Sequence, residues 1–446
     1  MIAAPASGSG KTMISCGLLW ILQKRGNVSG FKCGPDYVDP LFHKEMIGVP
    51  SRNLDSFLMG EDMVLERFCA NAKEYSVLEG VMGYYDGVGG ISVQASSYDI
   101  SRITKTPVIF VVDTKGMSLS VVAIIKGFLE YRKDSRIQGV IFNRTSPMMY
   151  PRLKKAVEQE LPVSVLGYLP FLPQCSIESR HLGLVTPTSE QDFHTRLQLL
   201  TETMEKTVDI DGILKLAEKA EALCMKKSER KKKPVVCRVA VAKDDAFCFY
   251  YEDNLELLEK LGCEIYFFSP LKDKHLPENV DGLLLGGGYP EVYAKTLSEN
   301  KSLLMQIKEV IKEGIPCVAE CGGFLYLHEE LEDLEGNFYP MAGVISGRAW
   351  KQDRLKHFGY STLTAQKDTL LCKKGEKISA HEFHYWDSEN NGDAFVSQKP
   401  LGTQHWNCIH AQGNLFAGFP HMHFYGNIRF AENFVEKCKQ YREEHH

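Results

Sequence analysis

The stretch Ala319-Glu320-Cys321-Gly322-Gly323 decides the fold of the C-terminal half of this chain. An apolar run from Ile315 to Ala319 precedes it and predicts a strand, while a helical pattern from Phe324 to Leu331 follows it. A cysteine at a strand-to-helix turn, backed by glycines, is typical of a nucleophile elbow. Such a turn lifts the sulfur clear of the sheet, and the helix N-terminus favours the thiolate. We therefore predict a nucleophile at Cys321, with an ordinary core cysteine as the alternative.

Two further signals fit a nucleophilic thiol. A glycine turn, Gly286 to Glu291, follows the apolar run Gly282 to Leu285 and could aim backbone N–H groups at an oxyanion. Near the C-terminus, His421 and His423 are suited to act as the base, although lone histidines more often serve packing. Together these features predict a thiol amide hydrolase.

The composition narrows the class of protein. With 446 residues the chain is long for one core, and 44% hydrophobic and 24% charged residues are ordinary for a globular protein. A net charge of −5 gives no reason to expect nucleic acid as a partner. No uninterrupted apolar run is long enough to predict a membrane span, so no membrane partner is expected. The 13 cysteines form no CxxC pair, which predicts reduced thiols and a cytoplasmic location.

The order of apolar and amphipathic segments predicts an α/β fold in two domains. Strands alternate with helices over residues 1–205, which favours a parallel sheet covered by helices. Residues 206–234 are expected to be a helix, over 206–224, followed by a basic linker. The linker run Lys226 to Pro234 could instead bind an anionic surface. Alternation restarts in a second domain, residues 235–446.

The expected elements can be given by their ranges. The predicted strands are Met1–Ala4, Val28–Lys32, Tyr75–Glu79, Pro107–Asp113, Gly139–Asn143, Val163–Leu169, Val235–Val241, Glu264–Phe268, Gly282–Leu285 and Ile315–Ala319. The predicted helices between them include Met13–Arg25, Leu119–Tyr131, Met149–Glu160, Asn254–Leu261 and Leu303–Glu313.

A phosphate-binding loop is predicted directly after the first strand. It comprises the residues Ser7, Gly8, Ser9, Gly10, Lys11 and Thr12. Successive backbone N–H groups there can wrap phosphates, Lys11 can reach the terminal phosphates, and the Thr12 hydroxyl can sit on Mg²⁺. The usual pattern has Gly or Ala where this chain has Pro5, so the loop is a variant. The alternative is a chance glycine-rich turn.

Two acidic residues end strands of the same predicted sheet. Glu79 ends one strand and Asp113 ends another, and ligands of open α/β sheets gather outside the carboxyl ends of strands. A carboxylate there can hold Mg²⁺ directly or through water. We predict a metal or substrate role for Glu79, and leave Asp113 open between that role and a cap of a turn.

The loop after the second strand, Phe31 to Pro40, lies at the same predicted edge. It could be a plain turn, because Gly, Pro and Asp are turn residues. However, Lys32, Asp36 and Asp39 there suit an acceptor carboxylate brought beside a γ-phosphate. Arg180 to Leu184 is a further polar segment, structural or ligand-facing. His381 and His384 are read as structural, since their surroundings resemble a strand rather than a helical zinc site.

The ordered set of these motifs resembles the cobyrinate/cobyrate glutamine-dependent amidotransferase family, and within it the cobyrinic acid a,c-diamide synthases. The resemblance spans nearly the whole chain. It rests on Ser7 to Thr12, Phe31 to Pro40, Asn53 to Asp55, Glu79 to Gly87, Arg180 to Leu184, Gly286 to Glu291, Ala319 to Gly323, His381 to Tyr385, and His421 to Phe424.

The resemblance implies the architecture and the reaction. It implies an N-terminal P-loop domain similar to dethiobiotin synthetase and a C-terminal class I glutamine amidotransferase-like α/β domain. The implied reaction uses two ATP and two glutamine, with Mg²⁺, to amidate the a- and c-carboxylates of a corrin through acyl phosphates. Its partners would thus be a tetrapyrrole carboxylic acid, ATP and glutamine, and a homodimer is among the assemblies that this interpretation allows.

The resemblance also implies roles for single residues. Cys321 would form the γ-glutamyl thioester with His421 as its base, and Gly287 and Gly322 are the oxyanion candidates. Typical class I enzymes carry a glutamate two positions after the histidine, where this chain has His423, so the third member of the site stays open. In the synthetase half, the expected substrate contacts are Lys32, Asp36, Tyr37 and Asp39, and the expected Mg²⁺ ligands are Thr12 and Glu79.

Two alternatives remain at this stage. The first is diamidation of a related tetrapyrrole, hydrogenobyrinic acid or nickel-sirohydrochlorin. The second belongs to another class, a non-catalytic P-loop nucleotide switch with a decayed amidotransferase domain. That second hypothesis predicts loss of Cys321 or His421, and both are present.

Overall fold

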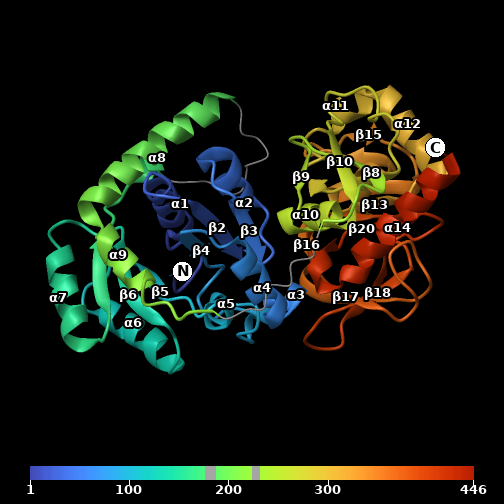
Figure 1. Ribbon diagram of the computed structural model, residues 1–446. Helices are drawn as coiled ribbons and strands as arrows, with labels where there is room; N and C mark the ends of the chain where they lie inside the picture. Colours follow the sequence, from blue (N-terminus) through green and yellow to red (C-terminus); the bar gives the residue numbers. More distant parts are fainter. Residues whose placement is uncertain (176–186, 224–231, 446) are drawn as a thin grey trace. The chain divides into compact units, whose positions relative to one another are not determined.

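The computed structural model describes residues 1–175, 187–223 and 232–445 (Figure 1). The chain forms two compact units, Met1–Ser228 and Glu229–His446, which Figure 1 colours blue to green and yellow to red. Two segments singled out in the sequence, Arg180 to Leu184 and the part of the basic run from Lys226 to Lys231, lie outside the described residues.

The first unit is built on a parallel seven-stranded sheet with the order β3-β2-β4-β1-β5-β6-β7. Its strands are β1 Ile2–Ala3, β2 Val28–Cys33, β3 Ser51–Leu54, β4 Tyr75–Glu79, β5 Val108–Asp113, β6 Ile137–Asn143 and β7 Ser164–Tyr168. The predicted strands of this half are confirmed; β3 was not predicted, because Ser-Arg-Asn-Leu is too short and polar to stand out.

Helices connect these parallel strands, as a parallel sheet requires. The longer ones are α1 Lys11–Leu22, α4 Glu61–Asn71, α5 Ser97–Ile103, α6 Ser120–Tyr131, α7 Tyr150–Glu160, α8 Pro187–Thr207 and α9 Ile210–Ala217. The single helix expected over 206–224 is wrong. The chain breaks after α8, where Val208 bridges to Gly167 of β7, and Asp209 restarts the helix by accepting a hydrogen bond from the Gly212 N–H at 2.8 Å.

The second unit contains a parallel sheet with the order β10-β8-β11-β13-β20. Its strands are β8 Cys237–Ala242, β10 Cys263–Phe268, β11 Gly282–Leu285, β13 Cys317–Glu320 and β20 Leu415–Gly418. The helices α10 Glu252–Leu261, α12 Lys301–Lys312 and α14 Ile428–His445 belong to the same unit, and α14 packs against α10 and β8. These elements match the predicted strands and helices of this half.

A second, mostly antiparallel sheet completes the unit. It is built around the long strands β16 Ile345–Ala365 and β17 Lys377–Ser388, and it also holds β14 His328–Glu332, β15 Phe338–Pro340, β18 Phe395–Gln398, β19 His405–Cys408 and β21 His421–Met422. The helix expected from Phe324 to Leu331 is therefore wrong beyond Tyr326. Helix α13 spans only Gly322–Tyr326, because buried His328 contacts the Phe324 carbonyl and Ser388 and turns the chain into a strand.

Among the described helices, none combines the length and the apolar character that a membrane crossing needs. The two units have separate apolar cores, one around α1 and the strands of the first sheet and one around β8, β11 and β13. In both parallel sheets, candidate site residues singled out in the sequence lie at or just after the ends of strands, Glu79 in the first unit and Cys321 in the second.

Candidate active sites

The predicted phosphate loop joins β1 to α1 in the first unit. Gly10 caps α1 with a φ of 98°, a conformation that side chains rarely adopt, and an added Cβ there would lie 2.3 Å from the Asn143 side-chain nitrogen. That Asn143 amide, at the end of β6, donates a hydrogen bond to the Ser9 carbonyl at 2.9 Å. Glycine is thus required at position 10 on two counts, and Asn143 supports the loop.

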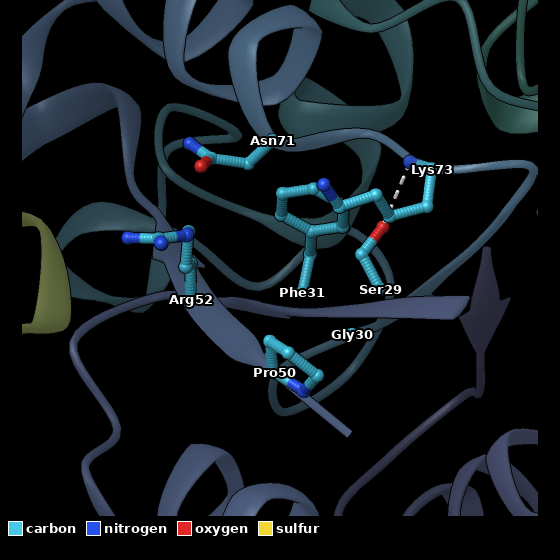
Figure 2. A pocket seen from close by; sticks show the side chains of 7 residues that line it. All are labelled: Ser29, Gly30, Phe31, Pro50, Arg52, Asn71 and Lys73. Atoms are coloured by element: carbon cyan, nitrogen blue, oxygen red, sulfur yellow. Dashed lines mark hydrogen bonds between the residues drawn. The ribbon is translucent and has the colours of Figure 1, made fainter. Parts of the chain in front are cut away.

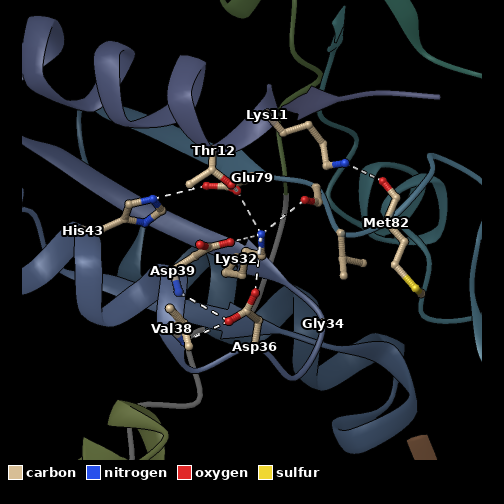
Figure 3. Close-up of polar contacts among 12 residues, drawn as sticks. Lys11, Thr12, Lys32, Gly34, Asp36, Val38, Asp39, His43, Glu79 and Met82 are labelled. Atoms are coloured by element: carbon tan, nitrogen blue, oxygen red, sulfur yellow. Dashed lines mark hydrogen bonds and ion pairs between the residues drawn. The ribbon is translucent and has the colours of Figure 1, made fainter. Parts of the chain in front are cut away.

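Lys11 lies folded over this loop. Its ammonium donates to the carbonyl oxygen of Met82 at 2.5 Å (Figure 3). It also donates to the carbonyl oxygen of Ala6 at 3.1 Å. Burial, and then the charge of Lys32, lower the pKa of Lys11 to about 8. A phosphate group would relieve both effects, because an anion favours the charged ammonium.

Glu79 is the centre of a buried polar cluster at the end of β4 (Figure 3). One carboxylate oxygen accepts hydrogen bonds from the Thr12 hydroxyl at 2.6 Å and the Lys32 ammonium at 2.9 Å. The other lies 3.3 Å from Nε2 of His43. Burial alone would raise the pKa of Glu79, but Lys32 and these hydrogen bonds hold it well below its usual range.

Lys32 gathers the acidic residues of the following loop. Its ammonium forms ion pairs with Asp39 and Glu79 and lies 3.8 Å from Asp36. The Asp36 carboxylate also accepts a hydrogen bond from the Val38 N–H at 2.8 Å, which closes the loop, and Tyr37 is buried on the same loop. Although burial lowers it, these carboxylates raise the pKa of Lys32 overall, so it stays an ammonium.

The oxygen atoms at this edge suit Mg²⁺. No group of three or more His, Cys, Asp or Glu side chains within 1–175, 187–223 and 232–445 forms a ready metal cage. Mg²⁺ bound to a nucleotide needs fewer protein ligands, because it usually takes one or two protein oxygens and completes its coordination shell with phosphates and water. The Thr12 hydroxyl and the Glu79 carboxylate, in mutual contact beside the loop, are such a pair.

Two residues of this site were not found from the sequence. His43 follows the loop and uses its other nitrogen, Nδ1, to contact the Ser51 hydroxyl at 3.0 Å, so it holds Glu79 from the far side. Asn53 on β3 donates to the carbonyls of Gly34 and Asp36 at 2.9 and 2.7 Å and braces the loop. In the sequence, the run Asn53 to Asp55 contributed to the family resemblance but had no predicted role. The structure shows that Asn53 holds the loop in place.

Asp113 follows the structural alternative. Its carboxylate pairs with Arg144 and accepts a hydrogen bond from the Lys115 N–H at 3.1 Å. Burial would raise its pKa, but the hydrogen bond from Arg144 lowers it. Asp113 therefore caps the turn after β5, and its carboxylate is already paired with Arg144.

A small pocket in the same unit lies apart from this edge (Figure 2). It is lined by residues from the beginning of β2, from β3 and from the end of α4: Ser29, Gly30, Phe31, Pro50, Arg52, Asn71 and Lys73. The phosphate loop opens at the carboxyl ends of the strands, so this pocket belongs to another part of the sheet.

In the second unit, Cys321 forms the predicted elbow. Its backbone has φ 46° and ψ −100°, which few residues with a side chain adopt. The strained turn is fastened on both sides, because the Cys321 N–H donates to the Gly418 carbonyl at 2.8 Å and the Cys321 carbonyl accepts from the Leu325 N–H at 2.9 Å. The residue is 8% exposed, so the sulfur is largely sheltered.

The structure brings His421 to this cysteine. Burial lowers the pKa of the His421 ring, but the charge of Cys321, a hydrogen bond with Cys321 and the nearby Glu320 carboxylate raise it to about 10 overall. Nδ1 of the ring lies 3.7 Å from a Glu320 carboxylate oxygen. A protonated imidazole beside a thiol favours the thiolate, the reactive form of cysteine.

The other histidines have different surroundings. The buried His423 ring lies against Tyr251 and Tyr425, with centroids 4.9 and 6.0 Å away. His384 pairs with Glu382 at 3.1 Å and stacks on a phenylalanine, and His381 is the register partner of His421 across β17 and β21. The strand-like surroundings predicted for His381 and His384 are confirmed.

The two oxyanion candidates lie beside the elbow. An added Cβ on Gly287 would stand 2.6 Å from Cε1 of His421, and one on Gly322 would stand 3.0 Å from the backbone nitrogen of Gly288. The Gly323 N–H donates to the Gly286 carbonyl at 2.9 Å, which ties the elbow to the glycine turn. The absence of side chains at these glycines is thus what lets the glycine turn lie against the elbow at Cys321.

Comparison with known proteins covers both units. Residues 1–184 match the CobQ/CobB/MinD/ParA nucleotide binding domain, and residues 238–428 match the CobB/CobQ-like glutamine amidotransferase domain. A cobyrinate a,c-diamide synthase of Caldanaerobacter subterraneus is 39% identical over 446 residues, covering 99% of this chain and 98% of that protein. The chain belongs to the cobyrinate a,c-diamide synthase family.

Other members of the family are equally similar. Cobyrinate a,c-diamide synthases of Clostridium acetobutylicum and Listeria innocua are each 41% identical, over 98% and 96% of this chain and 99% and 96% of their own lengths. The predicted family, its two α/β domain types and the class of enzyme, an ATP-dependent ligase that uses glutamine, are confirmed.

Proposed function

We propose that this chain amidates the a- and c-carboxylates of cobyrinic acid, taking nitrogen from glutamine and driving each amidation with ATP. The observation that carries the proposal is the presence of two built sites in one chain. One is a phosphate loop whose Thr12 meets Glu79, and the other is an elbow cysteine, Cys321, beside His421, whose pKa this cysteine raises.

The first site would activate the acceptor. A carboxylate is a poor acceptor for ammonia, because its oxygen is a bad leaving group, whereas an acyl phosphate has a good one. Lys11 and the loop amides would offset charge on the γ-phosphoryl group during its transfer to the acceptor oxygen. Lys32, held between Asp36, Asp39 and Glu79, would offset part of their negative charge at the edge where the acceptor carboxylate is expected to bind.

Mg²⁺ is part of this proposal. Thr12 and Glu79 would hold it, and the bound ion would neutralise charge on the phosphates. Lys32 already supplies one positive charge to Glu79, so the carboxylate is kept ionised in a buried place. His43 keeps the same carboxylate in a fixed orientation.

The second site would release ammonia. The Cys321 thiolate would attack the γ-carboxamide carbon of glutamine, and His421 would give a proton to the departing ammonia. A water molecule, deprotonated by His421, would then hydrolyse the γ-glutamyl thioester to glutamate and restore the thiol. Backbone N–H groups at Gly287 and Gly322 are the proposed donors to the tetrahedral oxyanion.

A substrate panel tests the acceptor. The purified chain is given ATP, Mg²⁺ and glutamine with cobyrinic acid, hydrogenobyrinic acid or nickel-sirohydrochlorin, and products are counted by mass spectrometry. We expect cobyrinic acid to stimulate glutamate release most and to gain two amides. The names of the relatives favour this acceptor over the two alternatives. Faster diamidation of either other tetrapyrrole would reassign the substrate.

A single substitution tests the division of labour. Cys321→Ser should abolish glutamine-dependent amidation and leave amidation with a high concentration of ammonium intact, because the hydroxyl cannot replace the thiolate while the first site is unchanged. Equal loss of both activities would contradict the assignment of Cys321 to ammonia release alone. Continued glutamate release by this variant would refute Cys321 as the nucleophile.

A further inference from the structure

We propose that Glu320 is the positioning residue of the Cys321–His421 pair. It would have the role that a glutamate two positions after the histidine has in typical class I amidotransferases. The inference rests on the proposed function, since it assigns a part in glutamine hydrolysis. It adds a residue that directly precedes the nucleophile, where neither the sequence pattern nor the family match assigns a role.

The backbone explains why Glu320 faces the histidine. Glu320 is the last residue of β13, and its register partner is Gly418 on β20, two residues before Pro420 and three before His421. The elbow begins at Cys321, so Glu320 is the last residue whose backbone still follows the strand.

The Glu320 carboxylate makes two contacts with one short strand. One oxygen accepts a hydrogen bond from the Met422 N–H at 3.2 Å, and the other lies 3.7 Å from Nδ1 of His421. One contact fixes the backbone that carries the histidine, and the other fixes the ring. With Nδ1 turned toward Glu320, the ring presents Nε2 as the nitrogen for the sulfur.

Chemically, Glu320 can act as the third member of a catalytic triad with Cys321 and His421. A carboxylate at the far nitrogen holds an imidazole in one orientation and stabilises the imidazolium that forms during proton transfer. The carboxylate is 11% exposed and the ring 4%, so their attraction is weakly screened. His423 is two positions after His421, but its ring lies against Tyr251 and Tyr425, and a second imidazole cannot supply the negative charge.

Two further ionisable groups lie near this pair, and neither is charged at neutral pH. His381, opposite His421 on β17, has its pKa lowered to about 3 by burial and by the charge of His421, so it is neutral. Tyr250 is buried nearby, and burial raises its pKa far above neutral. Cys321 and Glu320 therefore supply the negative charge at His421, and their separate removal can be compared.

The test uses the full chain and three readouts. Glutamine hydrolysis gives kcat and KM, ammonium-dependent amidation reports the first site, and the Cε1–H NMR signal of His421, assigned with His421→Asn, gives its titration midpoint. Glu320→Gln keeps the shape and removes the charge, and Glu320→Asp keeps the charge. The matched control is Glu382→Gln, which breaks the other buried carboxylate–histidine pair of this unit, Glu382–His384.

For Glu320→Gln we expect kcat for glutamine hydrolysis to fall about 10- to 100-fold, KM to change little, and the His421 midpoint to move to lower pH. Amidation with ammonium should persist, and Glu320→Asp should recover part of kcat. Glu382→Gln should leave the His421 midpoint in place.

Three results in the hydrolysis and NMR readouts would overturn the assignment. They are a Glu320→Gln kcat within twofold of the wild type, an unmoved His421 midpoint, or an equal shift of that midpoint in Glu382→Gln. Loss of ammonium-dependent amidation in Glu320→Gln would also overturn it, since the residue would then act on folding. These results leave the proposed function standing, because that function is tested separately by the substrate panel and by Cys321→Ser.

Discussion

Replacing Lys32 by methionine should destabilise the first unit far more than any exposed lysine does. Lys32 is 4% exposed, and its ammonium faces the carboxylates of Asp39, Glu79 and Asp36. Glu79 would keep Thr12 and His43 as neighbours. Burial and the charge of Glu79 already raise the pKa of Asp39 well above its usual range, and Asp39 would lose the cation that favours its charged form. Breaking a buried pair on one side costs about 3–5 kcal/mol, because a buried charge is left uncompensated.

The assay is hydrogen exchange read peptide by peptide, so that each unit reports separately. A loss of about 3–5 kcal/mol should speed the slowest exchange of β2 and β4 peptides by roughly 100- to 5000-fold, at about 1.4 kcal/mol for each factor of ten. The control is Lys126→Met on α6, where the ion pair with Glu130 is 3.9 Å long and exposed on both sides. That change should cost less than about 1 kcal/mol.

A second variant separates charge from packing. Lys32→Met with Asp39→Asn removes the orphaned carboxylate and should recover part of the lost protection, although it restores no ammonium. The reasoning is refuted if Lys32→Met exchanges like Lys126→Met, or if the double variant is no more protected than the single one. Both Lys32 variants should lose amidation with glutamine and with ammonium alike, because they act before nitrogen arrives.

Two other outcomes follow from the geometry. Gly10→Ala should weaken ATP binding at least about tenfold by calorimetry, because the residue has a φ of 98° and its Cβ would clash with Asn143. The control is Gly127→Ala within α6, where an added Cβ meets no other atom, and this variant should bind ATP normally. Equal ATP affinities of the two variants would contradict the fit described for the loop. His421 should stay protonated through neutral pH and titrate near pH 10, because its charged form is the stabilised one, and Cys321→Ala should lower that midpoint. An ordinary midpoint near 6.5 in the wild type would disprove the stabilised imidazolium at His421.

The elements around each site were predictable where local pattern and tertiary role agree. The strand before Cys321 is apolar throughout, and the phosphate loop has its glycines and its Lys-Thr pair in sequence, so short segments suffice. The prediction failed just after the elbow, where a helical pattern runs on through Leu331 but His328 is drawn to Ser388, sixty residues away. No local pattern records such a partner.

The same limit applies to the supporting residues. Asn143 reaches back across 134 residues to the phosphate loop, and Asn53 braces a loop that begins on a neighbouring strand. His43 and Glu320 stood inside or beside quoted motifs, yet their roles depend on strand order, which brings β4 next to β2 and β20 next to β13. Residues that carry the chemistry have recognisable types, while residues that orient them are ordinary until their neighbours are known.

The backbone at Cys321 has a consequence for how this position is kept. Its dihedral angles are ones that glycine adopts freely and that a side chain adopts only at a cost of about 1–3 kcal/mol. For folding alone, glycine would suit position 321 better than cysteine, because the backbone of the turn makes no use of the sulfur. Under the proposed function, the reactive thiol at this turn therefore comes with a loss of folding stability of that size.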